Sequence, residues 1–116
     1  MKNISVKKSK EFLIIEDLEK NLNDLYFSQN SKRRWEAQKN LNKFQNLQNA
    51  WKINFFIRDS NNIHLIFFGL NLLDRLVSFS WEIIEEKERK EIQNFLTSWI
   101  YRLTIDFNLF RQNITT

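Results

Sequence analysis

The stretch Phe67–Trp81, FFGLNLLDRLVSFSW, decides how this chain folds. It holds the only glycine of the sequence, Gly69, and it sets Asp74 beside Arg75 in an otherwise apolar run. A membrane-spanning helix needs about 20 consecutive apolar residues, and the two charges fall near the middle of this run. With its lead-in, the stretch is therefore predicted to form a buried helix over residues 63–79, and not a membrane span.

The composition predicts an all-helical fold. The chain has 116 residues, of which 42% are hydrophobic and 15% aromatic, so it can build one core of its own. It has no proline and a single glycine, whereas β-proteins need turn residues at short intervals. Cysteine is absent and histidine occurs once, so the sequence predicts no disulfide, no metal site and no bound cofactor.

Apolar residues recur at helical spacing in six segments, residues 11–27, 32–46, 49–58, 63–79, 85–103 and from 106 onward. The first two have clear stripes, made of Ile15, Leu18, Leu22 and Leu25, and of Ala37, Leu41 and Phe44. The fourth has apolar positions over more than half its circumference: 63, 66, 67, 70, 73, 76 and 77. The third and fifth are expected to bury Ala50, Trp51, Ile53, Phe56 and Ile57, and Ile92, Phe95, Leu96, Trp99 and Ile100. Ser31 is expected to cap the second segment, and Asp59 or Ser60 the fourth.

Short connections make successive helices pack as antiparallel hairpins. Hairpins of about 30–45 residues are typical of HEAT repeats. The fold prediction is thus an all-α, HEAT-like (ARM-type) right-handed superhelical solenoid of about two and a half to three repeats. A flexible basic leader, residues 1–10, would precede repeats over residues 11–46 and 49–79 and an incomplete repeat over residues 85–116. A plain helical bundle stays open, because no strict repeat of residue identities is present.

Two motifs resemble the N-terminal region of the importin-β/exportin superfamily of nuclear transport receptors. The first is RRWEAQKNLNKF, residues 33–44, in which the matching positions are Arg34, Ala37, Gln38, Leu41 and Phe44. The second is the apolar helix closed by Trp81. AWKINFFIRDSNN, residues 50–62, together with LLDRLVSFSW, is most similar to the exportin-6 subfamily. Gln38 stands where the superfamily has an acidic residue, and Gly69 in a helix interior costs about 1 kcal/mol relative to alanine.

The resemblance implies a segment of an exportin that shuttles between nucleus and cytoplasm. The implied partners are the Ran GTPase in its GTP form, protein cargo (actin–profilin for the exportin-6 subfamily) and nucleoporins, with no nucleic acid and no membrane insertion. This chain alone would hold only part of such a surface. A small helical adapter or structural bundle without Ran binding is the alternative.

Two sets of residues are candidates for Ran contact. The α-helical period places Lys32, Glu36, Lys39 and Lys43 on one charged face, where Lys32 and Glu36 are spaced for an i,i+4 ion pair. Trp35 lies opposite the apolar stripe of the same helix. Asn71, Asp74, Arg75 and Ser78 form a polar stripe on the helix over residues 63–79, where charges need solvent or a partner. A solvated surface is the alternative for both sets, and for the charged face it is the favoured one.

No residues are predicted to be catalytic, so the chain is not expected to be an enzyme. EIIEEKERKE, residues 82–91, is a mixed charge run with Glu86 and Lys90 spaced for an ion pair, and nothing there would shift one carboxyl pKa away from its neighbours. His64 is expected to be a polar residue at a helix end. A basic nucleic-acid binder ranks last, because acidic residues interrupt every basic face.

Overall fold

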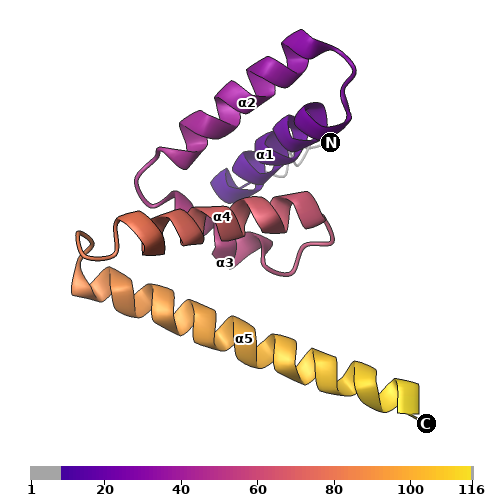
Figure 1. Ribbon diagram of the computed structural model, residues 1–116, viewed down its shortest axis with the longest axis vertical. Coiled ribbons are helices and arrows are strands. Elements are labelled where there is room, and N and C mark those ends of the chain that lie inside the picture. The colour runs from indigo at the N-terminus through magenta and orange to yellow at the C-terminus, as the bar shows by residue number, and fades with distance from the viewer. Residues whose placement is uncertain (1–8, 116) are drawn as a thin grey trace, which may run out of the picture. The chain divides into compact units, whose positions relative to one another are not determined.

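The structure, a computed structural model, describes residues 9–115, which form helices joined by turns and short loops (Figure 1). Its helices are α1 (Lys10–Phe27), α2 (Ser31–Gln45), the 3-10 helix η1 (Ala50–Ile53), α3 (Asn54–Ile57), α4 (Ile63–Phe79) and α5 (Glu86–Thr115). No strand occurs among these residues, so the all-α class is confirmed. The chain divides into two compact units, residues 1–74 and 75–116. The stacking of repeats into a solenoid stays a prediction.

Helices α1 and α2 pack side by side as a hairpin (Figure 1). The predicted stripes are confirmed at their centres, because Leu18 and Leu22 of α1 and Ala37 and Leu41 of α2 are buried. A polar link accompanies them: the buried Asn21 accepts from Asn40 Nδ2 at 3.1 Å and donates to the Asp17 carbonyl at 2.9 Å. Pairing both ends of its amide offsets the cost of burying it.

Asparagine caps the helices where serine or aspartate was predicted. Asn30 Oδ1 accepts from the backbone N–H groups of Lys32 and Arg33 at 3.0 and 3.3 Å, so α2 begins at Ser31 and Ser31 is not its cap. Asn62 Oδ1 does the same for His64 and Leu65 at 3.1 and 3.2 Å, in place of Asp59 or Ser60. An asparagine directly before the first turn reaches the N2 and N3 donors.

The segment predicted as one helix over residues 49–58 is divided. Asn49 has a left-handed backbone, with φ of 66°, and cannot be a helical residue. Asparagine adopts this conformation more readily than most residues. The chain then forms η1 and the single turn α3, which bury Trp51, Ile53 and Ile57, whereas Phe56 is exposed.

Gly69 lies where α4 crosses the segment η1–α3. The buried Asn54 donates its Nδ2 to the carbonyls of Gly69 at 3.0 Å and Trp51 at 2.8 Å. A Cβ at position 69 would stand 2.7 Å from Ile57 Cδ1 and closer still to Asn54 Oδ1. Glycine therefore allows the close approach of the two segments without displacing the Asn54 and Ile57 side chains, which explains a residue that is otherwise unfavourable in a helix interior.

The bounds predicted for α4 are confirmed, but the expectation that its broad apolar surface is buried on both sides is wrong for the described residues. The buried residues are Leu65, Phe68, Gly69, Leu72 and Leu73, whereas Ile63, Phe67 and Val77 are exposed. Of the seven predicted apolar positions only Leu73 is buried. The helix is apolar on most sides, so periodicity alone could not select the face, and the close approach at Gly69 does.

Helix α5 is continuous, so the predicted helix pair over residues 85–103 and 106–116 is wrong. No glycine or proline interrupts residues 86–115, and Thr104 Oγ1 donates to the Ile100 carbonyl at 2.8 Å within the helix. Asp106, expected to begin a sixth helix, is an ordinary position on the helix surface. Ile92, Phe95 and Trp99 are buried as predicted, while Ile100 is exposed.

The predicted leader over residues 1–10 falls mostly outside the described residues. At the first described residue, Ser9, the side chain caps α1 by accepting from the Phe12 N–H at 3.1 Å, and Lys10 is already helical. None of the helices in the described part of the chain combines the length and apolar character needed to cross a membrane.

Candidate protein-interaction surface

The predicted charged face of α2 is exposed at all four positions: Lys32, Glu36, Lys39 and Lys43. No ion pair joins Lys32 to Glu36 within residues 9–115. Lys39 instead places its Nζ 5.3 Å from the centroid of the Trp35 ring, a cation–π distance. Trp35 itself is 64% exposed, an unusual position for so large an apolar surface.

Beside Trp35 the surface of α2 is hollowed. This feature, called here the Trp35 hollow, has a volume of about 420 Å³ and is lined by Trp35, Gln38, Lys39, Asn42, Lys43 and Asn46. Two of the lining residues are joined, because Gln38 Nε2 donates to Asn42 Oδ1 at 2.9 Å. The hollow thus combines an indole, two ammonium groups and several amides, all on α2 and its C-cap residue Asn46.

The predicted polar stripe of α4 is also exposed at all four of its positions: Asn71, Asp74, Arg75 and Ser78. Their spacing of three and four residues keeps them on one side of the helix. That side is centred about 140° around the helix from Leu65, Gly69 and Leu72, which are buried. The stripe therefore has the solvent exposure that its charges require.

A second concavity lies among α1, α2 and α4. This feature, called here the aromatic-rimmed pocket, has a volume of about 130 Å³ and is lined by Leu22, Leu25, Tyr26, Gln38, Leu41, Gln45, His64, Phe67, Phe68 and Asn71. Its apolar lining comes from the hairpin stripe and from Phe68, whose ring lies 6.0 Å from that of Phe44. Its polar lining is made of side-chain amides, a phenol and an imidazole.

The ends of α1 and α4 meet through aromatic rings at this pocket. The Tyr26 and His64 rings stack with centroids 4.3 Å apart, and Phe27 meets His64 edge-on at 5.6 Å. Asn62 Nδ2 also donates to Glu19 Oε2 at 3.2 Å. His64 does lie at the helix start, as predicted, and its ring forms part of a wall between two helices.

The structure brings only part of the predicted site together. Asn71 of the α4 stripe lies in the same pocket as Gln38 and Gln45 of α2. The charged face of α2 lies about 140° around that helix from these two glutamines, at about 100° per residue. Gln38 lines both the pocket and the Trp35 hollow, so the two concavities are neighbours across this one side chain.

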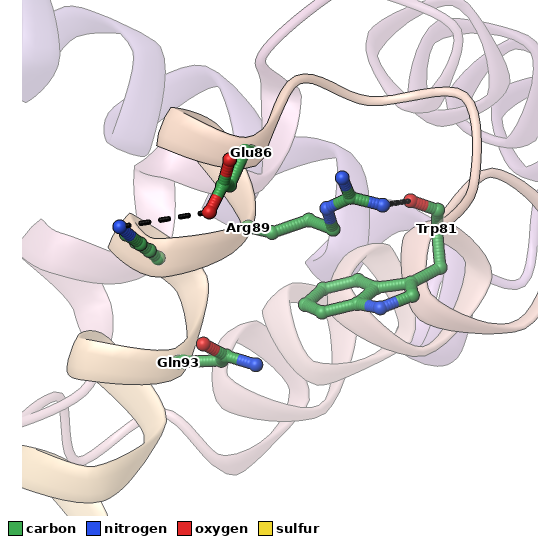
Figure 2. Close-up of a pocket in the computed structure, with 5 residues that line it drawn as sticks. Trp81, Glu86, Arg89 and Gln93 are labelled. Carbon is green, nitrogen blue, oxygen red and sulfur yellow. Dashed lines mark hydrogen bonds and ion pairs between the residues drawn. The ribbon is translucent and has the colours of Figure 1, made fainter.

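The turn after α4 forms a further concavity in the second unit. It has a volume of about 310 Å³ and is lined by Trp81, Glu86, Arg89, Lys90 and Gln93. Figure 2 shows the Arg89 guanidinium directed at the Trp81 carbonyl, to which Nη1 donates at 3.4 Å. The predicted pair of Glu86 and Lys90 is confirmed at 3.6 Å. The two cations of this concavity, Arg89 and Lys90, thus already have partners within the chain.

Sequence reasoning missed the residues that make the aromatic-rimmed pocket. Gln38 and Gln45 are one heptad apart and flank the buried Leu41, so they border the core side of α2. Tyr26 and Phe27 close α1 just after its apolar stripe, and both are exposed. This pairing of amides with aromatics at the edge of a stripe was the available signal. Within residues 9–115 no group of three or more metal-ligating side chains is present.

Comparison with known proteins finds part of this chain similar to an exportin. Over 71 residues it is 31% identical to Exportin-1 from Dictyostelium discoideum. The matched part is 60% of this chain and 7% of that relative, so the chain spans only a small part of the protein it is similar to. The narrower likeness to the exportin-6 subfamily is not supported. No family model matches the chain, and no solved structure matches it.

Proposed function

We propose that this chain is a segment of a nuclear transport receptor of the exportin kind, and that it acts by binding rather than by catalysis. The observation that carries the proposal is the similarity of 71 residues to Exportin-1. Support comes from the helical hairpin α1–α2, the architectural unit from which a HEAT-like receptor is built. Nucleocytoplasmic shuttling follows as part of the same proposal.

The finer proposal is that the charged face of α2 and the polar stripe of α4 contribute to binding of Ran in its GTP form. Both sets are exposed, which is a condition for contact. Each repeat of such a receptor contacts only its neighbours and offers a small area, so we expect this chain alone to bind Ran weakly. A cargo of actin–profilin, and contact with nucleoporins, belong to the complete receptor.

A retention experiment with Ran locked in each nucleotide state tests the proposal. The chain is immobilised by itself and also within a longer reading frame, if one exists, and Ran-GTP and Ran-GDP are compared with and without actin–profilin. Retention of Ran-GTP over Ran-GDP supports the proposal, and its loss on Glu36→Lys with Asp74→Lys assigns the surface. Equal retention of both forms favours the alternative, a small helical adapter without Ran binding.

A further inference from the structure

We propose that the aromatic-rimmed pocket and the Trp35 hollow together bind an acidic segment of a partner protein. One large apolar side chain of the segment occupies the pocket, and its neighbouring carboxylates lie over the lysines of the hollow. The two concavities share Gln38, so a segment crossing this side chain reaches both. The inference concerns the chemistry of the partner and does not rest on the proposed transport role.

The size of the pocket selects one side chain. Its volume is about 130 Å³, close to the engineered cavity of about 150 Å³ that takes up benzene. Leu22, Leu25, Leu41 and Phe68 supply an apolar lining. A leucine or phenylalanine side chain that enters this space moves out of solvent and gains part of the roughly 1.5–3 kcal/mol that full burial provides.

The polar lining suits the main chain on either side of that anchor. Gln38, Gln45 and Asn71 bring carboxamide groups from two helices to the same pocket. Each carboxamide both donates and accepts, as a peptide group does. The Asn71 amide makes no hydrogen bond within residues 9–115, so a bound segment can pair with it without breaking an existing contact.

Exposed aromatic side chains at the edge of the pocket enlarge the contact area. Tyr26 and Phe67 line it and are 57% and 55% exposed. Phe27, 65% exposed, meets the His64 ring that also lines it. Tyrosine and other aromatic residues are enriched at the energetic centres of protein interfaces.

The positive charge of α2 selects the residues of the bound segment that lie next to its apolar anchor. Helix α2 carries five basic side chains and one acidic one, Glu36. Two of the basic groups, Lys39 and Lys43, line the hollow with Trp35. Carboxylates are the complementary groups, and complementary charge raises the association rate and fixes the register. Nucleic acid is the less favoured polyanion, because Lys39 already lies over the Trp35 ring on which a base would stack.

The test is a nuclear magnetic resonance titration of the full isotope-labelled chain. The probe is a peptide with a central leucine flanked by three glutamates on each side. We expect saturable shifts of the side-chain amide signals of Gln38, Gln45 and Asn71. Replacing the central leucine of the peptide by alanine weakens binding about tenfold or more, and replacing its glutamates by lysines abolishes it.

Protein variants test the same assignment from the other side. Lys39→Glu with Lys43→Glu weakens binding of the acidic peptide about tenfold and favours the lysine-flanked one. Asn71→Trp, at an exposed position, covers the pocket and removes binding of both. The matched control is Lys20→Glu, an exposed charge about 160° around α1 from Leu22, which leaves the affinity unchanged. Circular dichroism establishes that each variant is folded.

Three results overturn the proposal. One is the absence of saturable shifts at millimolar peptide, and another is equal affinity for the leucine and alanine peptides. The third is a single-stranded oligothymidine that shifts the same signals more tightly than the acidic peptide, which assigns the surface to nucleic acid. Because the peptide substitutions need no change in the protein, the test stays decisive even where a variant fails to fold.

Discussion

At the scale of single residues, Gly69 and Asn54 determine how α4 packs against the segment η1–α3. The Asn54 side-chain amide donates to the Gly69 carbonyl, and a Cβ at position 69 would displace the Asn54 and Ile57 side chains. Helix propensity alone favours alanine over glycine by about 1 kcal/mol. Overpacking opposes this with a typical cost of about 1–3 kcal/mol, so the packing effect exceeds the propensity effect.

We therefore expect Gly69→Ala to lower the free energy of unfolding, measured by urea denaturation. Asn71→Ala, an exposed change on the same helix, is the control and stays within about 0.5 kcal/mol. Asn54→Ala removes the nearest obstructing atoms, so Gly69→Ala costs less in that background, a coupling typical of residues in contact. A Gly69→Ala chain that is more stable than the parent contradicts the packing seen here.

At the scale of elements, asparagine side chains cap the starts of α2 and α4. Asn30→Ala should destabilise the chain by about 1 kcal/mol, because it removes acceptors for the Lys32 and Arg33 N–H groups. Ser31→Ala is the matched control, since Ser31 already lies inside α2. Thermal unfolding followed by circular dichroism measures both. If Ser31→Ala lowers the stability more than Asn30→Ala does, Ser31 is the cap, as expected from the sequence.

The continuity of α5 is a second prediction about an element. Residues 103–107 should show helical Cα chemical shifts with no break, because Thr104 satisfies its hydroxyl inside the helix and no breaker residue is present. Thr104→Pro removes a backbone donor and should divide the helix, at a cost of about 3 kcal/mol or more. Random-coil chemical shifts at these residues in the unchanged chain would contradict a continuous α5 and support the predicted separate sixth helix.

At the scale of the whole molecule, exposed apolar side chains determine behaviour in solution. The second half of α5 exposes Ile100, Leu103, Phe107 and Leu109, and the turn before it exposes Ile83. We expect the isolated chain to self-associate with rising concentration, as measured by size-exclusion chromatography with light scattering.

The double substitution Leu103→Glu with Phe107→Glu should shift the chain toward the monomer. The control Ser98→Glu, at an exposed position about 160° around α5 from that pair, should not. A chain that stays monomeric at every concentration contradicts this expectation.

The candidate site was predictable only in part. Exposure of Lys39, Trp35 and Asp74 followed from their positions opposite the apolar stripes of α2 and α4. The aromatic-rimmed pocket did not, because it depends on His64 and Tyr26 meeting across two helices that lie far apart in the sequence. Spacing within one helix determines which residues share a face, but it says nothing about which faces meet.

The sequence by itself determined the all-helical class and the bounds of α4, because apolar spacing, the scarcity of glycine and the absence of proline act locally. It also determined the buried stripes of α1 and α2, each flanked by polar residues. Only the tertiary structure decided which face of FFGLNLLDRLVSFSW is buried. That helix is apolar on most sides, so its orientation depends on the close approach of Asn54 and Ile57 to Gly69, residues that no local pattern connects.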